Sequence, residues 1–217
     1  MTVARRCGAT SRGAAAVNKA GTDLVRRQVC VAAAAAGAAA LGSRLTPHAR
    51  AAVVVADHGR IEPPVPIPDI PVRRAGDGAS AGLAGMLRGR VTALHLMFTG
   101  CSSVCPIQGA IFERVQDLLP EQQEAGIQLM SLSVDPRVDT PRALQAWLER
   151  FEARAGWIAV APKPEDLGRL LDLFGQGRNA LDTHATQVNI INRRADLVFR
   201  TAELPSADAI ASILRRV

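Results

Sequence analysis

Two cysteines stand at the point where a buried-strand pattern gives way to a helix pattern. Cys101 and Cys105 lie in the segment Phe98–Pro106, after the apolar run 91–98 and before the helix-like run 107–119. A strand that leads directly into a helix is the repeating unit of α/β folds. We therefore expect the pair at one edge of a sheet, close to the N-terminus of a helix.

The same alternation continues to the end of the chain. The order of patterns is β-α-β-α and then β-β-α, which predicts an α/β fold: a thioredoxin-like sandwich with a central mixed β-sheet flanked by helices. The expected strands are 91–98, 127–134, 157–160, 187–191 and 197–201, and the expected helices are 107–119, 141–153, 164–174 and 206–216. We found no internal repeat.

The positive charge of the chain is confined to its N-terminal segment. Residues 1–51 hold eight of the 26 Lys and Arg residues but one of the 20 Asp and Glu residues. Residues 52–217 hold the remaining 18 basic and 19 acidic residues, a net charge of −1. The folded part is thus close to neutral, and no nucleic-acid partner is expected.

Residues 1–51 have the pattern of an export signal or anchor. Arg26 and Arg27 precede the uncharged run 28–43, whose apolar centre is shorter than the roughly 20 residues of a membrane span. The arginine pair resembles a twin-arginine signal, and Ala49-Arg50-Ala51 offers a small-x-small cleavage site. We expect an exported protein, periplasmic or otherwise extracytoplasmic, and tethered to the membrane if the segment stays uncleaved. A disordered cytoplasmic leader is the alternative.

The remaining residues divide into an extended segment and one domain. Residues 52–75 are rich in Val and Pro, which predicts an extended tether or edge segment. Residues 76–217 form the expected thioredoxin-like domain, in which 76–89 is expected to be a loop because small residues predominate. Asp139 and Thr140 precede Pro141 and are expected to cap a helix.

The cysteine pair indicates thiolate chemistry. Backbone N–H groups and the dipole at a helix N-terminus stabilise a thiolate relative to a thiol. A spacing of four residues is expected to place the sulfurs of Cys101 and Cys105 on one face of the first helical turn. Two such sulfurs can form a disulfide or bind a soft metal ion such as Cu(I) or Zn(II).

Three features of the sequence together resemble one known protein family. The segment Phe98–Pro106 resembles the F-T-x-C-x-x-x-C-P signature of the SCO/SenC family. Residues 132–141 resemble its S-V-D-P-x-x-D-T-P stretch, and the lone His184 precedes an apolar strand, where the family places its third copper ligand. The resemblance covers roughly residues 62–217.

The resemblance implies a copper-binding assembly factor with a thioredoxin fold. Its metal ligands are expected to be Cys101, Cys105 and His184, binding Cu(I) or Cu(II). The expected role is to deliver copper to cytochrome c oxidase or to prepare its copper site. The expected partner is the copper-receiving oxidase subunit or another copper chaperone.

Other functions remain open. An extracytoplasmic thiol–disulfide oxidoreductase acting on the cysteines of a copper-binding partner would use Cys101 and Cys105 as its redox-active pair without needing His184. The loop before strand 187–191 lacks the proline that general reductases place there. A thiol peroxidase, which Ser102-x-x-Cys105-Pro106 faintly suggests, and an inactive domain are the remaining alternatives.

Three further side chains near the motif have simpler interpretations. His95 and Met97 lie within the strand before the cysteines and are expected to pack in the core. Asp135 follows the next strand, at an end where this fold carries its active surface, and is expected to shape its loop rather than recognise a partner.

Overall fold

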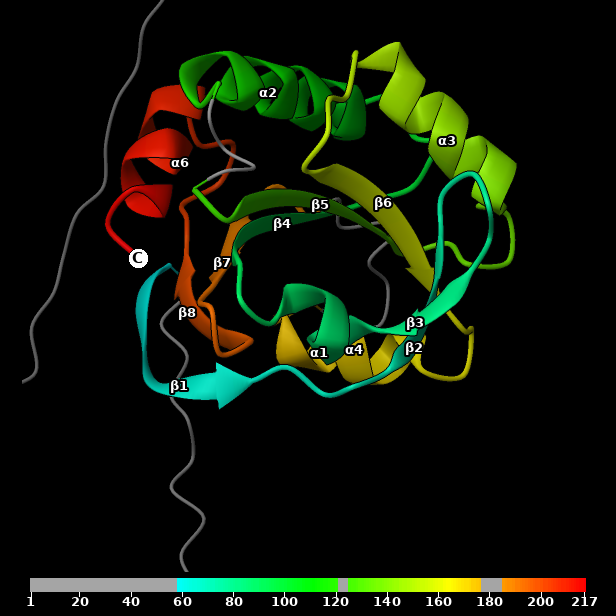
Figure 1. Ribbon diagram of the computed structural model, residues 1–217. Helices are drawn as coiled ribbons and strands as arrows, with labels where there is room; N and C mark the ends of the chain where they lie inside the picture. Colours follow the sequence, from blue (N-terminus) through cyan, green and yellow to red (C-terminus); the bar gives the residue numbers. More distant parts are fainter. Residues whose placement is uncertain (1–57, 121–124, 177–184) are drawn as a thin grey trace, which may run out of the picture. The chain divides into compact units, whose positions relative to one another are not determined.

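A single mixed β-sheet organises the chain (Figure 1). The structure is a computed structural model that describes residues 58–120, 125–176 and 185–217. The strand order is β1-β8-β7-β4-β5-β6-β2-β3. The strands are β1 (Gly59–Pro66), β2 (Pro71–Arg74), β3 (Ser80–Gly82), β4 (Val91–Met97), β5 (Ile127–Ser133), β6 (Trp157–Pro162), β7 (Val188–Ile191) and β8 (Asp196–Arg200).

The three central strands are parallel and buried on both faces. β4 pairs with β5, and β5 with β6, in parallel, whereas all other pairings are antiparallel. Every residue of β4 and β5 is buried, as expected for parallel strands covered on both sides. The carboxyl ends of β4 and β5 therefore meet at one edge of the sheet. That edge carries the cysteines.

Helices cover both faces of the sheet, which gives a three-layer α/β sandwich (Figure 1). One core cluster joins the sheet to α2, α3 and α6, and a second joins it to α1 and α4. The helices are α1 (Leu83–Leu87), α2 (Val104–Leu118), α3 (Pro141–Arg150), α4 (Leu167–Leu173) and α6 (Ala207–Leu214). The expected fold class is confirmed, and each expected helix and strand corresponds to an observed one with ends shifted by a few residues.

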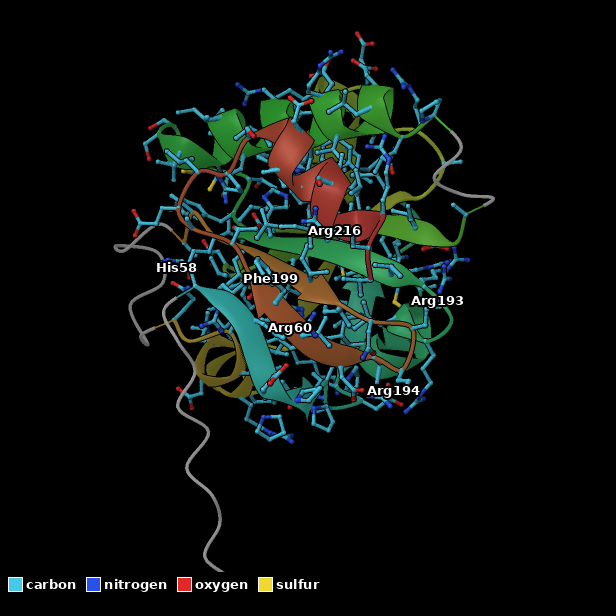
Figure 2. All side chains as sticks on the ribbon, turned by 90° about the vertical axis from the view of Figure 1, so that its left-hand side faces the viewer. His58, Arg60, Arg193, Arg194, Phe199 and Arg216 are labelled. Atoms are coloured by element: carbon cyan, nitrogen blue, oxygen red, sulfur yellow. The ribbon has the colours of Figure 1, made fainter. Side chains whose placement is uncertain are left out.

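The segment 52–75, expected to be extended, contributes two strands to the sheet. β1 forms an edge of the sheet beside β8, with Arg60 opposite Phe199 (Figure 2). β2 pairs with β6 on the other side of the sheet. Within the described ranges, no helix is long and apolar enough to cross a bilayer. The segment 1–51, expected to be an export signal or anchor, lies outside the described residues.

The expectation of a loop at 76–89 holds for residues 76–79 and 88–89 and is wrong for the residues between them. Residues 80–82 form β3 and residues 83–87 form α1. The helix is short, but Leu83, Ala84 and Leu87 share one face and are buried in the second core cluster. Burial in the core thus stabilises a helix that was not predicted, because small residues predominate in this segment.

The β7–β8 turn anchors the sheet edge opposite the cysteines. Arg193 donates to the carbonyls of Gly89 and Ala125, 3.1 and 3.0 Å away, which precede β4 and β5. Arg193 and Arg194 lie together at this turn in Figure 2. These contacts fix the amino ends of the two strands whose carboxyl ends lead into the site.

Candidate metal and thiol site

Cys101 and Cys105 lie between the carboxyl end of β4 and the first turn of α2. The N–H of Cys101 donates to the carbonyl of Phe98 at 3.1 Å, which closes a tight turn directly after the strand. α2 begins at Val104, so Cys105 is within its first turn whereas Cys101 precedes the helix. The expectation that both cysteines share the first helical turn is therefore wrong. The Phe98–Cys101 turn, not helical periodicity, brings Cys101 into place.

The two thiols nevertheless meet. Both cysteines are free and buried, with 5% and 3% of their surface exposed. The thiol of Cys105 donates a hydrogen bond to the sulfur of Cys101. The structure thus places two free, buried cysteines close enough to influence one another.

The environment of Cys101 favours its thiolate. Burial raises its pKa, but the Ser103 hydroxyl, the N–H groups of Cys105 and Ser103, and the Cys105 thiol donate to the sulfur. Together these donors lower the pKa of Cys101 to about 6. The Ser103 oxygen is 3.5 Å from the sulfur. Cys101 is therefore mostly thiolate at neutral pH.

Cys105 behaves in the opposite way. Burial raises its pKa to about 12, assisted by the hydrogen bond to Cys101 and the negative charges of Cys101 and Asp139, although the N–H of Phe98 opposes the rise. Cys105 therefore stays protonated until it binds a cation or forms a disulfide. At neutral pH the site is one thiolate and one thiol, which suits both thiol exchange and the binding of a soft cation.

Asp139 is buried beside the pair and does not cap α3. Its carboxylate accepts hydrogen bonds from the N–H of Thr99 at 3.1 and 3.3 Å, from the Thr99 hydroxyl at 2.6 Å and from the Ser133 hydroxyl at 2.6 Å. The expected capping role is therefore wrong for Asp139. For Thr140 it is confirmed, because its hydroxyl accepts from the N–H of Ala143 at 3.2 Å.

Asp135 shapes the loop between β5 and α3 through its main chain. Its N–H donates to the Ser133 hydroxyl at 3.1 Å, and its carbonyl accepts from the N–H groups of Val138 and Asp139. These contacts agree with the loop-shaping interpretation.

His184, the expected third ligand, lies outside the described residues, so its distance from the two sulfurs is not defined. Within residues 58–120, 125–176 and 185–217, no three His, Cys, Asp or Glu side chains are grouped so that they could hold a metal ion. The structure brings together two of the three expected ligands.

His95 and Met97 are buried core residues, as expected. The Nε2 of His95 lies 2.7 Å from the Ser131 hydroxyl, which also accepts from the indoles of Trp147 and Trp157 at 3.3 and 3.0 Å. Since an indole N–H can only donate, the single hydroxyl proton of Ser131 goes to Nε2, which leaves the imidazole proton on Nδ1. Burial lowers the pKa of His95 to about 3, although the Gln108 side chain, as an acceptor, opposes this.

Sequence reasoning missed the polar groups that control the thiols. Ser103 stands between the cysteines, and Ser133 is the last residue of the buried strand β5. A serine in a fully buried strand needs a partner, and that requirement is the signal that could have identified Ser133. Its partner, Asp139, is apparent only in three dimensions.

Comparison with known proteins adds a family to this geometry. The SCO1/SenC family model matches residues 81–217. A protein of Stutzerimonas stutzeri that bears the name of a copper-binding protein is 34% identical over 89 residues. The match spans 41% of this chain and 43% of that relative's length.

Solved structures share the fold at low sequence identity. A SCO1/SenC family lipoprotein from Bacillus anthracis str. Ames has a TM-score of 0.55 and 23% identity, over 71% of this chain and 97% of its own. Copper-bound ScoI from Arabidopsis thaliana has a TM-score of 0.56 and 17% identity, over 70% and 96%. These likenesses support the thioredoxin-like fold.

Proposed function

This chain belongs to the SCO1/SenC family, and we propose that it is a copper-binding assembly factor whose cargo binds at Cys101 and Cys105. The observation that carries the proposal is the pair of free, buried cysteines between the end of β4 and the first turn of α2. Copper-bound structures among its fold relatives and the name of the Stutzerimonas protein are consistent with copper as the cargo.

The chemistry of the pair suits Cu(I). Thiolates are soft ligands, and Cu(I) is a soft cation that accepts few of them. Binding to both sulfurs requires the thiolate of Cys101 as it stands and the loss of one proton from Cys105 to solvent. The net charge of the site is then the same before and after binding, because Cu⁺ replaces H⁺.

We further propose His184 as the third ligand. An imidazole nitrogen suits both Cu(I) and Cu(II), so it would hold copper in either oxidation state. It precedes β7, which pairs with β4, the strand that leads to the cysteines. Three ligands would still leave room for a partner's ligand to enter during transfer.

The proposed recipient is a copper-receiving subunit of cytochrome c oxidase or another copper chaperone. Both cysteines are almost fully buried, so transfer requires direct docking at the carboxyl edge of the sheet. A recipient with more ligands would take the copper by stepwise ligand exchange. The export pattern of residues 1–51 supports a site of action outside the cytoplasm.

A thiol–disulfide oxidoreductase is the second candidate, and the asymmetry of the pair favours it over a purely structural dithiol. The Cys101 thiolate would attack a partner disulfide, forming a mixed disulfide and releasing one partner thiolate. Cys105 would then lose its proton and attack the Cys101 sulfur, which releases the second partner thiolate and leaves a Cys101–Cys105 disulfide. Two electrons pass to the partner, and the same two residues serve both functions.

Anaerobic Cu(I) titration of four full-length proteins tests the proposal: the parent, Cys101→Ser, Cys105→Ser and His184→Ala. Cys7 and Cys30 are present in all four, so differences in stoichiometry report on the site. We expect the parent to bind one Cu(I) more than either serine variant, and His184→Ala to bind it more weakly while still forming the disulfide. Equal binding by parent and His184→Ala contradicts the third ligand. A parent that binds no Cu(I) at the pair but reduces a partner disulfide establishes the oxidoreductase instead.

A further inference from the structure

Asp139 joins the two loops that form the thiol site. It lies between β5 and α3, and only 1% of its surface is exposed. One of its oxygens accepts from the Thr99 hydroxyl and the other from the Ser133 hydroxyl, both at 2.6 Å. The N–H of Thr99 completes the set. A buried carboxylate satisfied by three donor groups from two segments is costly to arrange, and this one belongs to no ion pair among the described residues.

The position of Thr99 gives these bonds a consequence for the cysteines. Thr99 lies inside the turn that the Cys101 N–H closes onto the Phe98 carbonyl. The N–H of Phe98, at the start of the same turn, donates to the sulfur of Cys105. Holding Thr99 therefore holds both the backbone that carries Cys101 and a donor to Cys105.

The other side of Asp139 is equally fixed. Its own N–H donates to the carbonyl of Asp135 at 2.9 Å, and the next residue, Thr140, caps α3. The carboxylate is thus attached to a rigid helix start and cannot easily follow a movement of the turn. Its negative charge acts on Cys105 as well, because it contributes to the raised pKa of that thiol.

We propose that Asp139 is a positioning residue of the thiol site: through Thr99 it fixes the turn that carries Cys101, and it holds a carboxylate beside the pair. The copper part of this inference rests on the proposed function, whereas the thiol part does not. The charge of Asp139 gives this proposal a specific consequence for the two oxidation states of copper. Cu(II) carries one more positive charge than Cu(I), so the Asp139 carboxylate attracts it more strongly. Holding the turn also keeps Cys101 beside Cys105, so Asp139 favours closure of the disulfide over the separated reduced pair.

Asp139→Asn tests the proposal because it removes the charge at nearly constant size. Asp135→Asn is the matched control, since it removes the same charge from the same loop while the Asp135 main-chain contacts remain. We expect Asp139→Asn to weaken Cu(II) binding by about tenfold or more and Cu(I) binding by a smaller factor, with Asp135→Asn close to the parent. We also expect the Cys101–Cys105 disulfide of Asp139→Asn to be more easily reduced in glutathione buffers, by about tenfold in its equilibrium constant.

Thr99→Val separates position from charge, because it removes the hydroxyl bond and keeps the carboxylate. We expect it to weaken Cu(I) and Cu(II) binding by similar factors, and it also serves if Asp139→Asn does not fold. If folded Asp139→Asn has the same copper affinities and the same disulfide equilibrium as Asp135→Asn, the proposal is overturned, even if its melting temperature is lower. Parental copper affinities in Thr99→Val overturn it as well. If the parent binds no copper, the proposed function fails, and the shift in the disulfide equilibrium still decides the role of Asp139.

Discussion

At the scale of single residues, the site depends on the unequal environments of two identical side chains. Burial raises the pKa of both Cys101 and Cys105, but hydrogen-bond donors outweigh it at Cys101, whereas negative charge adds to it at Cys105. The donor that is most readily changed is Ser103, whose side chain lies beside the Cys101 sulfur.

Ser103→Ala removes this donor and should raise the pKa of Cys101. In the parent, the alkylation rate of Cys101 by iodoacetamide should rise with pH around a midpoint of about 6. The variant should reach its midpoint at higher pH and react about three- to tenfold more slowly at pH 6. Peptide mapping by mass spectrometry assigns the reaction to Cys101. Ser102→Ala is the neighbouring control and should keep the parental profile; a parental profile in Ser103→Ala contradicts the assignment.

His95 makes stability depend on pH. Its pKa is about 3 in the folded chain and close to its ordinary value of 6.5 when unfolded, so the unfolded chain binds the extra proton between these values. The contribution of neutral His95 to stability is complete above pH 6.5 and is lost as the pH falls toward 3. Between pH 7 and pH 4 the loss from this one group should be about 3 kcal/mol.

Urea unfolding of the parent and of His95→Gln at both pH values measures this contribution. The variant should be less stable at pH 7, because it loses the ring contact with Phe112, whose centroid is 4.3 Å away. Its further loss on going to pH 4 should be smaller than that of the parent by about the stated amount. Equal pH dependence in both proteins would show that His95 does not remain neutral in the fold.

At the scale of elements, helix packing explains which glycines matter. A Cβ on Gly109 of α2 would lie 2.4 Å from two ring atoms of Phe151, so only glycine lets α2 approach that ring. A Cβ on Gly168 of α4 would meet nothing within 4 Å. Gly109 and Gly168 therefore form a matched pair with opposite expectations.

Gly109→Ala should destabilise the chain by about 1–3 kcal/mol, because either the helix or the ring must move. Gly168→Ala should stabilise it by about 0.4–1 kcal/mol, because alanine loses less conformational freedom on folding. Denaturant unfolding at neutral pH measures both. A stabilised Gly109→Ala would mean that the ring moves aside without cost.

The elements also show how far sequence reasoning reaches. Long buried strands and helices with clear starts were predicted within a few residues, because periodicity and residues such as Pro141 act locally. The role of Asp139 was not predicted, because the sequence Asp-Thr-Pro is also typical of a helix cap. Its true partner, Thr99, is 40 residues away, and only the packing of β4 beside β5 brings them together. Likewise, α1 depends on burial rather than on local preference.

At the scale of the whole molecule, the sheet gives the site its location. The turn that carries Cys101 follows β4 and the loop that carries Asp139 follows β5, and these parallel strands end at the same edge. The opposite ends are held by Arg193, so the two loops project from a fixed base. The motifs in the sequence predicted the fold and the family, whereas the place of Asp139 and the unequal pKa values of the two thiols required the structure.

Proton release during Cu(I) binding tests the central claim most directly. Reduced, full-length protein is titrated anaerobically with Cu(I) at pH 7.5 in a weak buffer, with Cys105→Ser as the reference for all other sites. The account predicts that the parent binds one additional Cu(I) and releases one additional proton, supplied by Cys105. If the reduced parent binds no more Cu(I) than Cys105→Ser, the thiolate–thiol pair is not a copper site.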